Sequence, residues 1–386
     1  MKAALPRRVF GAVWFSYYAT IGLFNPYAPL WFNALGFSTL AIGAIASLQA
    51  WTRVFAPYAW AWLGDRTGQR VRLMRVASGA ALLSAAGLLF ARDYGAVALC
   101  TALLFVSNGG VVPLSEATLA AHLNTAQGLD TRRYGRTRVW GSLGFIVSVV
   151  LAGALLQWLG IRHFPALLLA LGGALFVATL RLPATRDDTS GHGHGASVRA
   201  VLRRPEVQWF FASVFFTVLA HTGLYAFFSL YLVGLGYHKS VVGMLWAVSV
   251  AAEIVFFWFQ GRMFVRLPAS GWLQWAALAA ALRFAATAAW AELVVVLVLA
   301  QALHALSFAA HHAACVVQIS RHFPGVLRGR GQALYTVLGY GIPGVLGGLG
   351  GGWLSARWGF AAVFWASAVT ALLGLACARR AARLQR

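Results

Sequence analysis

The sequence predicts an all-α integral membrane protein with twelve transmembrane helices in two six-helix bundles. Of its 386 residues, 60% are hydrophobic and only 10% are charged, and the mean hydropathy is +0.72. Soluble domains carry about 25% charged residues, so a soluble fold would expose much apolar surface to water. The apolar residues form long runs without the ten-residue alternation of membrane β-strands. Helices are therefore the spanning structure that the sequence supports.

Twelve apolar runs are long enough to cross a membrane, since about 20 residues span roughly 30 Å of hydrocarbon. The predicted spans are 9–33, 39–63, 72–91, 95–122, 138–160, 164–181, 207–233, 240–261, 271–289, 293–319, 332–354 and 360–378. The first run follows a basic start but has no evident small-residue cleavage site. We expect it to be an uncleaved helix and not a signal peptide.

The longest polar stretch, residues 182–206, divides the spans six and six. We therefore expect an N-terminal bundle at 1–181, a cytoplasmic linker at 182–206 and a C-terminal bundle at 207–386. A flexible link between two bundles is typical of transporters whose halves rock about a central site.

The charge distribution predicts the orientation. The formal charge of +22 could indicate nucleic-acid binding, but the cations form no basic domain and fall in short clusters between apolar runs. With the N-terminus inside, 25 of the 31 Lys and Arg residues lie in cytoplasmic segments, as the positive-inside rule describes. We expect a monomer in a bacterial-type inner membrane, with both termini cytoplasmic and no nucleic-acid partner.

The segment Ala61–Arg70, after the second span, reads Ala-Trp-Leu-Gly-Asp-Arg-Thr-Gly-Gln-Arg. Asp65 can pair with an arginine or a helix N-terminus, and Gly68 permits a tight turn. The segment resembles the major facilitator signature Gly-x-Leu-x-Asp-Arg-x-Gly-Arg-Arg, with two departures. The resemblance implies a gating role for Asp65, Arg66 and Gly68. A chance polar turn is the alternative.

Ionisable and polar side chains inside the spans are candidate site residues, because charge in a bilayer is expensive. Interhelical fastening by hydrogen bonds is the alternative for each of them. The charged candidates are Arg53, Glu116, Glu253 and Arg283. Polar residues at helical spacing are Thr217, His221 and Tyr225 in span seven, and Gln301, His304, Ser307, His311, Cys315 and Gln318 in span ten.

Two further patterns do not indicate cofactor chemistry. The histidines of span ten have no carboxylate or cysteine partner in a recognisable ligand motif, so no metal is expected. Gly339–Gly344 matches the dinucleotide pattern GxGxxG, but no strand precedes it. We expect these glycines to permit helix bending and close packing, and we predict no cofactor.

The whole chain resembles the oligosaccharide:proton symporter group of the major facilitator superfamily, which includes lactose permease. The likeness rests on the proline-rich segment 22–31, on Tyr134–Ser142 and on residues of six further spans. Arg53, the acid after Pro113–Leu114 and the Ala220–His221 pair with Tyr225 look more like the 3-phenylpropionate permease-like branch. The resemblance implies the major facilitator fold.

The resemblance also implies roles for individual residues. Glu253 matches a coupling glutamate, Arg283 a span-nine arginine and His304 a span-ten histidine of lactose permease. Arg138 matches a sugar-binding arginine, which implies a deeper position than the cytoplasmic rim where counting places it. Lactose permease carries its proton-bearing glutamate where this chain has Ser307, and its span-four sugar-binding glutamate has no match in register.

We therefore expect proton-coupled symport of a small organic solute, such as an aromatic or other organic acid. Glu253 is the expected proton carrier, because burial favours a protonated carboxylate and nearby cations such as Arg283 and His304 oppose this. The expected substrate-binding residues are Arg53, Glu116, Arg138, His221 and Tyr225. Sugar or nucleoside symport is the alternative. A membrane enzyme should show clustered catalytic acids and a sensor an extra soluble domain; the chain has no such cluster and no loop long enough.

Overall fold

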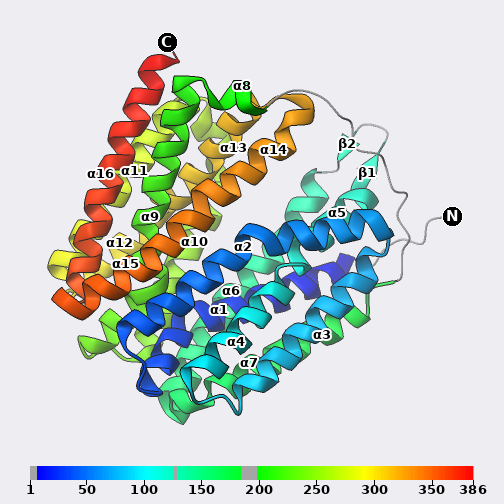
Figure 1. The fold of residues 1–386 in the computed structure, drawn as a ribbon, viewed down its shortest axis with the longest axis vertical. Coiled ribbons are helices and arrows are strands. Elements are labelled where there is room, and N and C mark those ends of the chain that lie inside the picture. The colour runs from blue at the N-terminus through cyan, green and yellow to red at the C-terminus, as the bar shows by residue number, and fades with distance from the viewer. Residues whose placement is uncertain (1–6, 126–127, 130, 184–197, 386) are drawn as a thin grey trace. The chain divides into compact units, whose positions relative to one another are not determined.

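The computed structural model describes residues 7–125, 128–129, 131–183 and 198–385 (Figure 1). The described chain is almost entirely helical, as predicted. A short antiparallel pair, β1 (Asn124–Thr125) and β2 (Gly128–Leu129), lies in the loop before the fifth predicted span.

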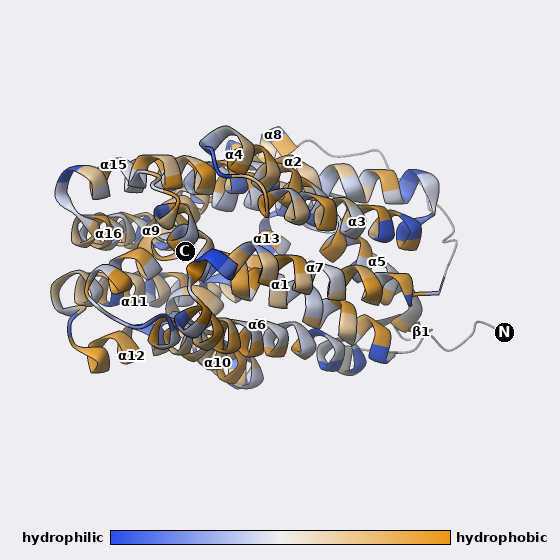
Figure 2. Ribbon diagram, turned by 90° about the horizontal axis from the view of Figure 1, so that it is seen from below, coloured by the Kyte–Doolittle hydropathy of each residue, from blue (hydrophilic) through white to orange (hydrophobic). Residues whose placement is uncertain are grey.

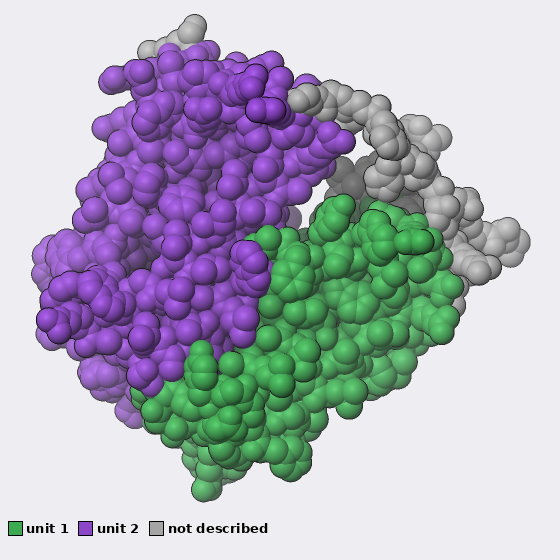
Figure 3. Space-filling view, in the orientation of Figure 1, with its two compact units in different colours: residues 1–37, 52–191 green, residues 38–51, 192–386 purple. Residues whose placement is uncertain are grey.

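The chain forms two compact units, which are coloured in Figure 3. One contains residues 1–37 and 52–191, and the other contains residues 38–51 and 192–386. The helices up to residue 180 are α1 (Arg7–Ala34), α2 (Thr39–Thr67), α3 (Arg70–Leu88), α4 (Tyr94–Asn108), α5 (Val111–Leu123), α6 (Thr131–Leu159), the 3-10 turn η1 (Ile161–His163) and α7 (Phe164–Leu180).

The remaining helices belong to the second unit. They are α8 (Val198–Leu202), α9 (Pro205–Gly234), α10 (Lys239–Phe264), α11 (Ala269–Trp290), α12 (Val294–Ala302), α13 (His311–His322), α14 (Arg328–Leu334), α15 (Ile342–Trp358) and α16 (Phe360–Leu384). Two π-helical segments, η2 (Ala305–Ala310) and η4 (Tyr335–Gly341), join α12 to α13 and α14 to α15. The 3-10 turn η3 (Gly325–Leu327) precedes α14.

Nine helical stretches among the described residues are long and apolar enough to cross a membrane. Figure 2 shows apolar residues along most of the ribbon and hydrophilic residues mainly near helix ends. The long helices α1, α2 and α11 are not among the nine, although each contains a predicted span. In α1 and α2, prolines and several aromatic residues with polar groups lower the mean hydropathy. The count of twelve spans therefore stays a prediction.

The predicted linker, 182–206, lies mostly outside the described residues. Its end forms the short helix α8 and the first turn of α9. Helix α2 is shared, because its residues 39–51 group with the second unit and its residues from Thr52 onward group with the first. This division groups the start of a helix from the N-terminal half with the C-terminal helices.

Close packing of α1 on α6 fixes the middle of the first unit. A Cβ atom added at Gly144 would overlap the carbonyl of Phe15, and one added at Gly22 would lie 2.7 Å from the carbonyl oxygen of Phe145. Tyr27 donates a hydrogen bond across the same contact to the Val149 carbonyl, at 2.7 Å. Only glycine allows backbones to approach so closely, so these residues set the position of the side chains that follow on α6.

In the second unit, α9 packs on α16, and α16 packs on α11. Gly374 of α16 lies against α9, where an added Cβ would be 2.5 Å from Thr217 Oγ1. The Ser213 hydroxyl donates to the Gly374 carbonyl at 3.0 Å. This contact holds α9 and α11 on neighbouring faces of α16, and both helices carry candidate site residues.

The first part of α2 packs on α15 through small residues. Gly348 and Gly352 on α15 are four residues apart and share a helix face. A Cβ atom added at Gly43 would overlap the Gly348 carbonyl. Ser47 of α2 donates to the Val345 carbonyl at 2.7 Å. We call this contact, formed by Gly43, Ser47, Gly348 and Gly352, the glycine seam.

Candidate functional site

The predicted gating motif forms the turn between α2 and α3. Gly68 adopts a positive φ of 64°, a conformation that suits glycine. Asp65 accepts a hydrogen bond from Arg70 Nη2 at 2.7 Å, and the two form an ion pair across the turn. The Arg66 guanidinium lies over the Trp62 ring, 5.2 Å from its centroid. The motif therefore closes on itself within the first unit.

A chain of ionisable groups lies inside the second unit. His304 Nε2 is 2.8 Å from Glu253 Oε1. The other ring nitrogen of His304 contacts Arg283 Nη1. The structure thus brings together three residues from α10, from the turn after α12 and from α11, with the histidine between the acid and the base. We call this chain the Glu–His–Arg network.

The network differs in exposure from one end to the other. Arg283 is only 1% exposed and His304 is 3% exposed, whereas the Glu253 side chain is 18% exposed. A buried charge needs partners to offset its loss of hydration. The more accessible carboxylate is therefore the group that protons and substrate can reach most easily.

Arg283 is held by further polar side chains. Its Nη1 donates to Ser307 Oγ at 3.0 Å, and its Nη2 donates to Gln301 Oε1 at 3.0 Å. Ser249 of α10 donates to the same Gln301 oxygen at 2.6 Å. The guanidinium carbon also lies 5.0 Å from the centre of the Phe284 ring. These contacts fix the direction of the guanidinium.

The predicted residues of span seven border this network from α9. His221 Nε2 is 3.2 Å from Ser307 Oγ, and His221 Nδ1 is 2.8 Å from the Thr217 carbonyl. The Thr217 carbonyl is an acceptor, so Nδ1 carries the proton and Nε2 accepts from Ser307. Tyr225, one turn further along, lies 5.9 Å from Trp246 and 6.5 Å from Phe308, measured between ring centres.

A π-helical segment begins directly after His304. The segment η2 contains Ser307, which contacts both Arg283 and His221. Single π-helical turns occur frequently at functional sites. The sequence placed Gln301 and Ser307 on one stripe with His304, and all three are buried, but helical spacing could not reveal the widened turn. Ser249 was not among the predicted site residues, because a serine in an apolar helix carries little signal.

A second cluster of candidate residues lies in the first unit. Arg138 of α6 donates from Nη2 to the Tyr18 hydroxyl of α1 at 2.7 Å. Its guanidinium carbon is 4.6 Å from the Tyr18 ring centre and 4.9 Å from the Trp14 ring centre. Trp14 is fixed in turn by donating to Ser115 Oγ at 3.0 Å. An arginine flanked by two aromatic rings suits a ligand with a carboxylate and an apolar body.

Counting the predicted spans placed Arg138 at the cytoplasmic rim, whereas the resemblance implies a deeper position. Helix α6 begins at Thr131, so Arg138 lies about two turns inside the helix. The polar start of α6 hid these turns from a hydropathy reading. Glu116 of α5 lies in the same cluster, where it forms a hydrogen bond with Tyr134 and interacts electrostatically with Arg138.

Arg53 of α2 interacts electrostatically with Tyr17 and Tyr18 and therefore borders this cluster. Its side chain is exposed. The candidate residues thus fall into two groups. Arg53, Glu116 and Arg138 gather in the first unit, and His221, Tyr225, Glu253, Arg283 and His304 gather in the second.

Comparison with known proteins gives matches to membrane transport proteins. The model of the family described as "MFS_1 like family" matches residues 9–366. The chain is 29% identical over 371 residues to the "Probable 3-phenylpropionic acid transporter" of Escherichia coli (strain K12), covering 93% of each protein. It is 27% identical over 378 residues to the "Maltose permease" of Geobacillus stearothermophilus, covering 97% of this chain and 94% of that protein.

Solved structures share the fold. The nucleoside transporter NupG matches with a TM-score of 0.82 at 16% identity, covering 98% of this chain and 99% of that one. A bacterial homologue of the lysosomal transporter Spinster matches with a TM-score of 0.76 at 13% identity, covering 98% and 96%.

Proposed function

The chain belongs to the MFS_1 like family of membrane transporters, and we propose that it is a secondary transporter that imports a small organic acid together with protons. The proposed substrate is an aromatic acid of the phenylpropionate kind. We also propose that it is a monomer in a bacterial inner membrane with both termini cytoplasmic. Its Lys and Arg distribution supports the position of the termini.

The Glu–His–Arg network is the observation that supports proton coupling. With Glu253 ionised, Arg283 protonated and His304 neutral, the network carries no net charge. A proton taken up at Glu253 changes the net charge to +1. Two charges interact strongly in a medium of low dielectric constant. The protonated network, with its charge of +1, therefore attracts a substrate monoanion, and the neutral network does not. Proton binding and anion binding would thereby favour one another.

The Arg138 cluster supports an aromatic acid as the substrate. A guanidinium has five N–H groups, and the hydrogen bond to Tyr18 uses one of them. A substrate carboxylate can accept two others in a bidentate arrangement. The rings of Trp14 and Tyr18, which flank the guanidinium, provide apolar area for an aryl group. We propose that His221 and Tyr225 also bind the substrate.

Alternating access needs contacts that break and re-form. We assign one such role to the glycine seam, since α2 groups with the second unit only as far as residue 51. We assign another to the turn that holds Asp65, Arg66 and Gly68. Its Asp65–Arg70 ion pair is partly exposed, so we expect its contribution to stability to be modest and its exchange during the transport cycle to cost little.

Sugar or nucleoside symport is the alternative. Glu116 favours it, because a carboxylate in a site with aromatic rings can accept hydrogen bonds from sugar hydroxyl groups. The similarity to a maltose permease and to a nucleoside transporter points the same way. The two proposals differ in the charge of the substrate, which makes them separable by a direct assay.

The test is uptake into liposomes that contain the purified protein, with the outside more acidic than the lumen. We expect accumulation of labelled 3-phenylpropionate, and little accumulation of maltose or uridine. Protein-free liposomes measure passive entry of the protonated acid. The Arg138→Gln variant should lower uptake of the acid at least tenfold, because it loses the charged bidentate donor. Accumulation of maltose or uridine without that of the acid would favour the alternative.

A further inference from the structure

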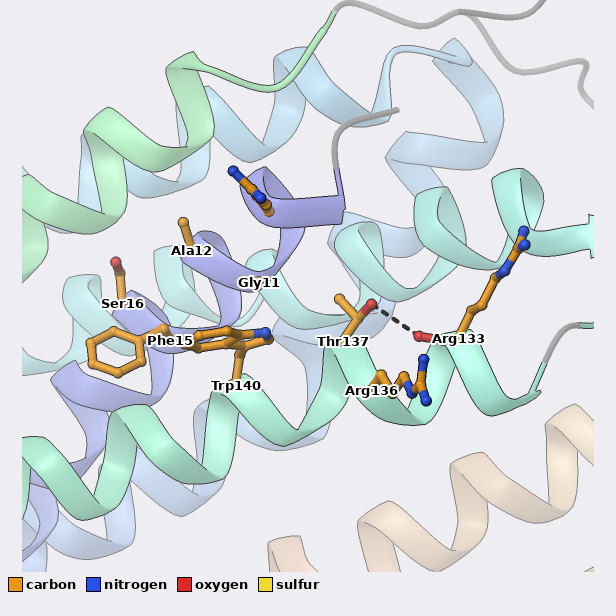
Figure 4. Close-up of a pocket in the computed structure, with 9 residues that line it drawn as sticks. Gly11, Ala12, Phe15, Ser16, Arg133, Arg136, Thr137 and Trp140 are labelled. Atoms are coloured by element: carbon orange, nitrogen blue, oxygen red, sulfur yellow. Dashed lines mark hydrogen bonds between the residues drawn. The ribbon is translucent and has the colours of Figure 1, made fainter. Parts of the chain in front are cut away.

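A cavity of about 670 Å³ opens between the first turns of α1 and α6 (Figure 4). Its size is within the range of small-molecule sites. Arg138 is not among its lining residues, which come from residues 133–140 of α6 and from the start of α1. The Lys and Arg distribution predicts that these helix ends face the cytoplasm.

Three exposed arginines gather around this cavity. Arg8 comes from α1, and Arg133 and Arg136 come from α6. The remaining lining residues carry no acidic group. Figure 4 shows Arg133 and Arg136 at one end of the cavity, with Phe15 and Trp140 further along. Two of the three arginines therefore lie at one end of the cavity, and the aromatic side chains lie nearer the other end.

The N-termini of α1 and α6 add to the positive electrostatic potential around these arginines. Arg8 is in the first turn of α1, which begins at Arg7, and Arg133 is in the first turn of α6. The N-terminus of a helix carries a partial positive charge that favours anions and disfavours cations. Neither helix has an acidic residue in its first turn. An anion bound here would relieve the repulsion.

The positive-inside rule accounts for arginines on this side of the membrane, but not for their gathering with aromatic side chains around one cavity. Trp140 lies across α1 at Gly11, where an added Cβ would be 3.0 Å from Trp140 Cδ1. Glycine at position 11 therefore leaves room for the Trp140 ring, beside the cavity that Gly11 and Ala12 also line.

An apolar stripe continues from the cavity along α6. Trp140, Leu143, Val147 and Leu151 follow one another at spacings of three and four residues, and each is between 39% and 57% exposed. Residues at this spacing share one helix face. An acyl chain lying on this face would extend from the part of the cavity near Trp140. A small soluble anion would make no contact with the stripe.

We propose that the cavity binds one anionic phospholipid, with the phosphate at the end that holds Arg133 and Arg136, further positive charge from Arg8, and an acyl chain along the stripe of α6. Basic pockets between membrane helices on the cytoplasmic side bind anionic headgroups. Trp140 sits between the two regions, as aromatic residues do at membrane interfaces. The proposal does not depend on which solute the protein transports.

The test is native mass spectrometry of the full-length protein in detergent, titrated with phosphatidylglycerol or with phosphatidylcholine of the same acyl chains. We expect one phosphatidylglycerol to bind in preference to phosphatidylcholine. Each basic residue strengthens binding to anionic lipid by about fivefold. The triple variant Arg8→Gln, Arg133→Gln, Arg136→Gln should therefore bind phosphatidylglycerol about a hundredfold more weakly.

The matched control removes the same charge elsewhere. Arg379, Arg380 and Arg383 are exposed at the end of α16, and replacing all three by Gln should leave lipid binding unchanged. Ala12→Trp should weaken binding by filling the cavity while the arginines remain. Unfolding temperatures without lipid show whether each variant is folded.

Three results would overturn the proposal. One is equal binding of the two lipids by the wild type. Another is unchanged phosphatidylglycerol binding in folded triple and Ala12→Trp variants. The third is displacement of the lipid by glycerol 3-phosphate or 3-phenylpropionate at concentrations comparable to that of the lipid, which would identify a site for soluble anions.

Discussion

Replacing Glu253 by Gln should lower uptake driven by a pH gradient at least tenfold, yet leave exchange of substrate across the membrane largely intact. Glutamine resembles a protonated glutamate in shape but cannot release a proton. The variant network would keep its positive charge in every state, so substrate could still bind and cross. Coupling requires a group whose proton affinity depends on conformation, and the variant would lack one. Gradient-driven uptake and counterflow in the same liposomes measure the two activities.

Glu292→Gln is the matched control, because Glu292 follows α11 and is exposed. It should leave both activities unchanged. The competing explanation is that Glu253 only balances the charge of Arg283 through His304. In that case the double variant Glu253→Gln, Arg283→Gln would restore gradient-driven accumulation, and that recovery would rule out Glu253 as the proton carrier.

Replacing Gly348 by Ala should reduce the transport rate at least tenfold. The added methyl group would overlap Ser47 Oγ and lie 2.6 Å from the carbonyl oxygen of Gly43. The obstructing atoms include backbone, so α2 and α15 would have to move apart. If the glycine seam closes and opens in each transport cycle, the state with the seam closed becomes unfavourable and turnover falls. Initial uptake rates per reconstituted molecule give the effect.

Gly350→Ala is the control for this prediction. Gly350 lies two residues further along α15, and an added Cβ meets no atom within 4 Å. Both substitutions replace glycine in a helix, where alanine is favoured by up to about 1 kcal/mol. Gly350→Ala should therefore transport normally and be slightly more stable. Equal rates in the two variants would show that close approach at the seam is not needed for turnover.

Much of the fold could be predicted from the sequence, because unpaired backbone polar groups are so costly in a bilayer that few spanning structures are possible. Long apolar runs must be helical, and each predicted span overlaps a helical stretch of the structure. The ends were less certain where helices extend beyond the apolar region. The start of α6 is polar, and this concealed the two helical turns that precede Arg138.

The candidate site was only partly predictable. Burial cost singled out Glu253 and Arg283, and helical spacing grouped His304 with Gln301 and Ser307. Contacts between helices depend on packing, which one sequence does not specify. Gln301 accepts hydrogen bonds from both Arg283 and Ser249, and the sequence alone could not predict this. The cavity beside Gly11 likewise arises from the pairing of α1 with α6.

The central claim is that substrate and protons move together, and proton flow driven by substrate tests it most directly. Liposomes containing the protein and a pH-sensitive dye in the lumen are given 3-phenylpropionate outside, with no initial pH gradient. We expect the lumen to become acidic faster than in protein-free liposomes, and Glu253→Gln to abolish the excess. Substrate entry without any excess acidification over protein-free liposomes would contradict the account.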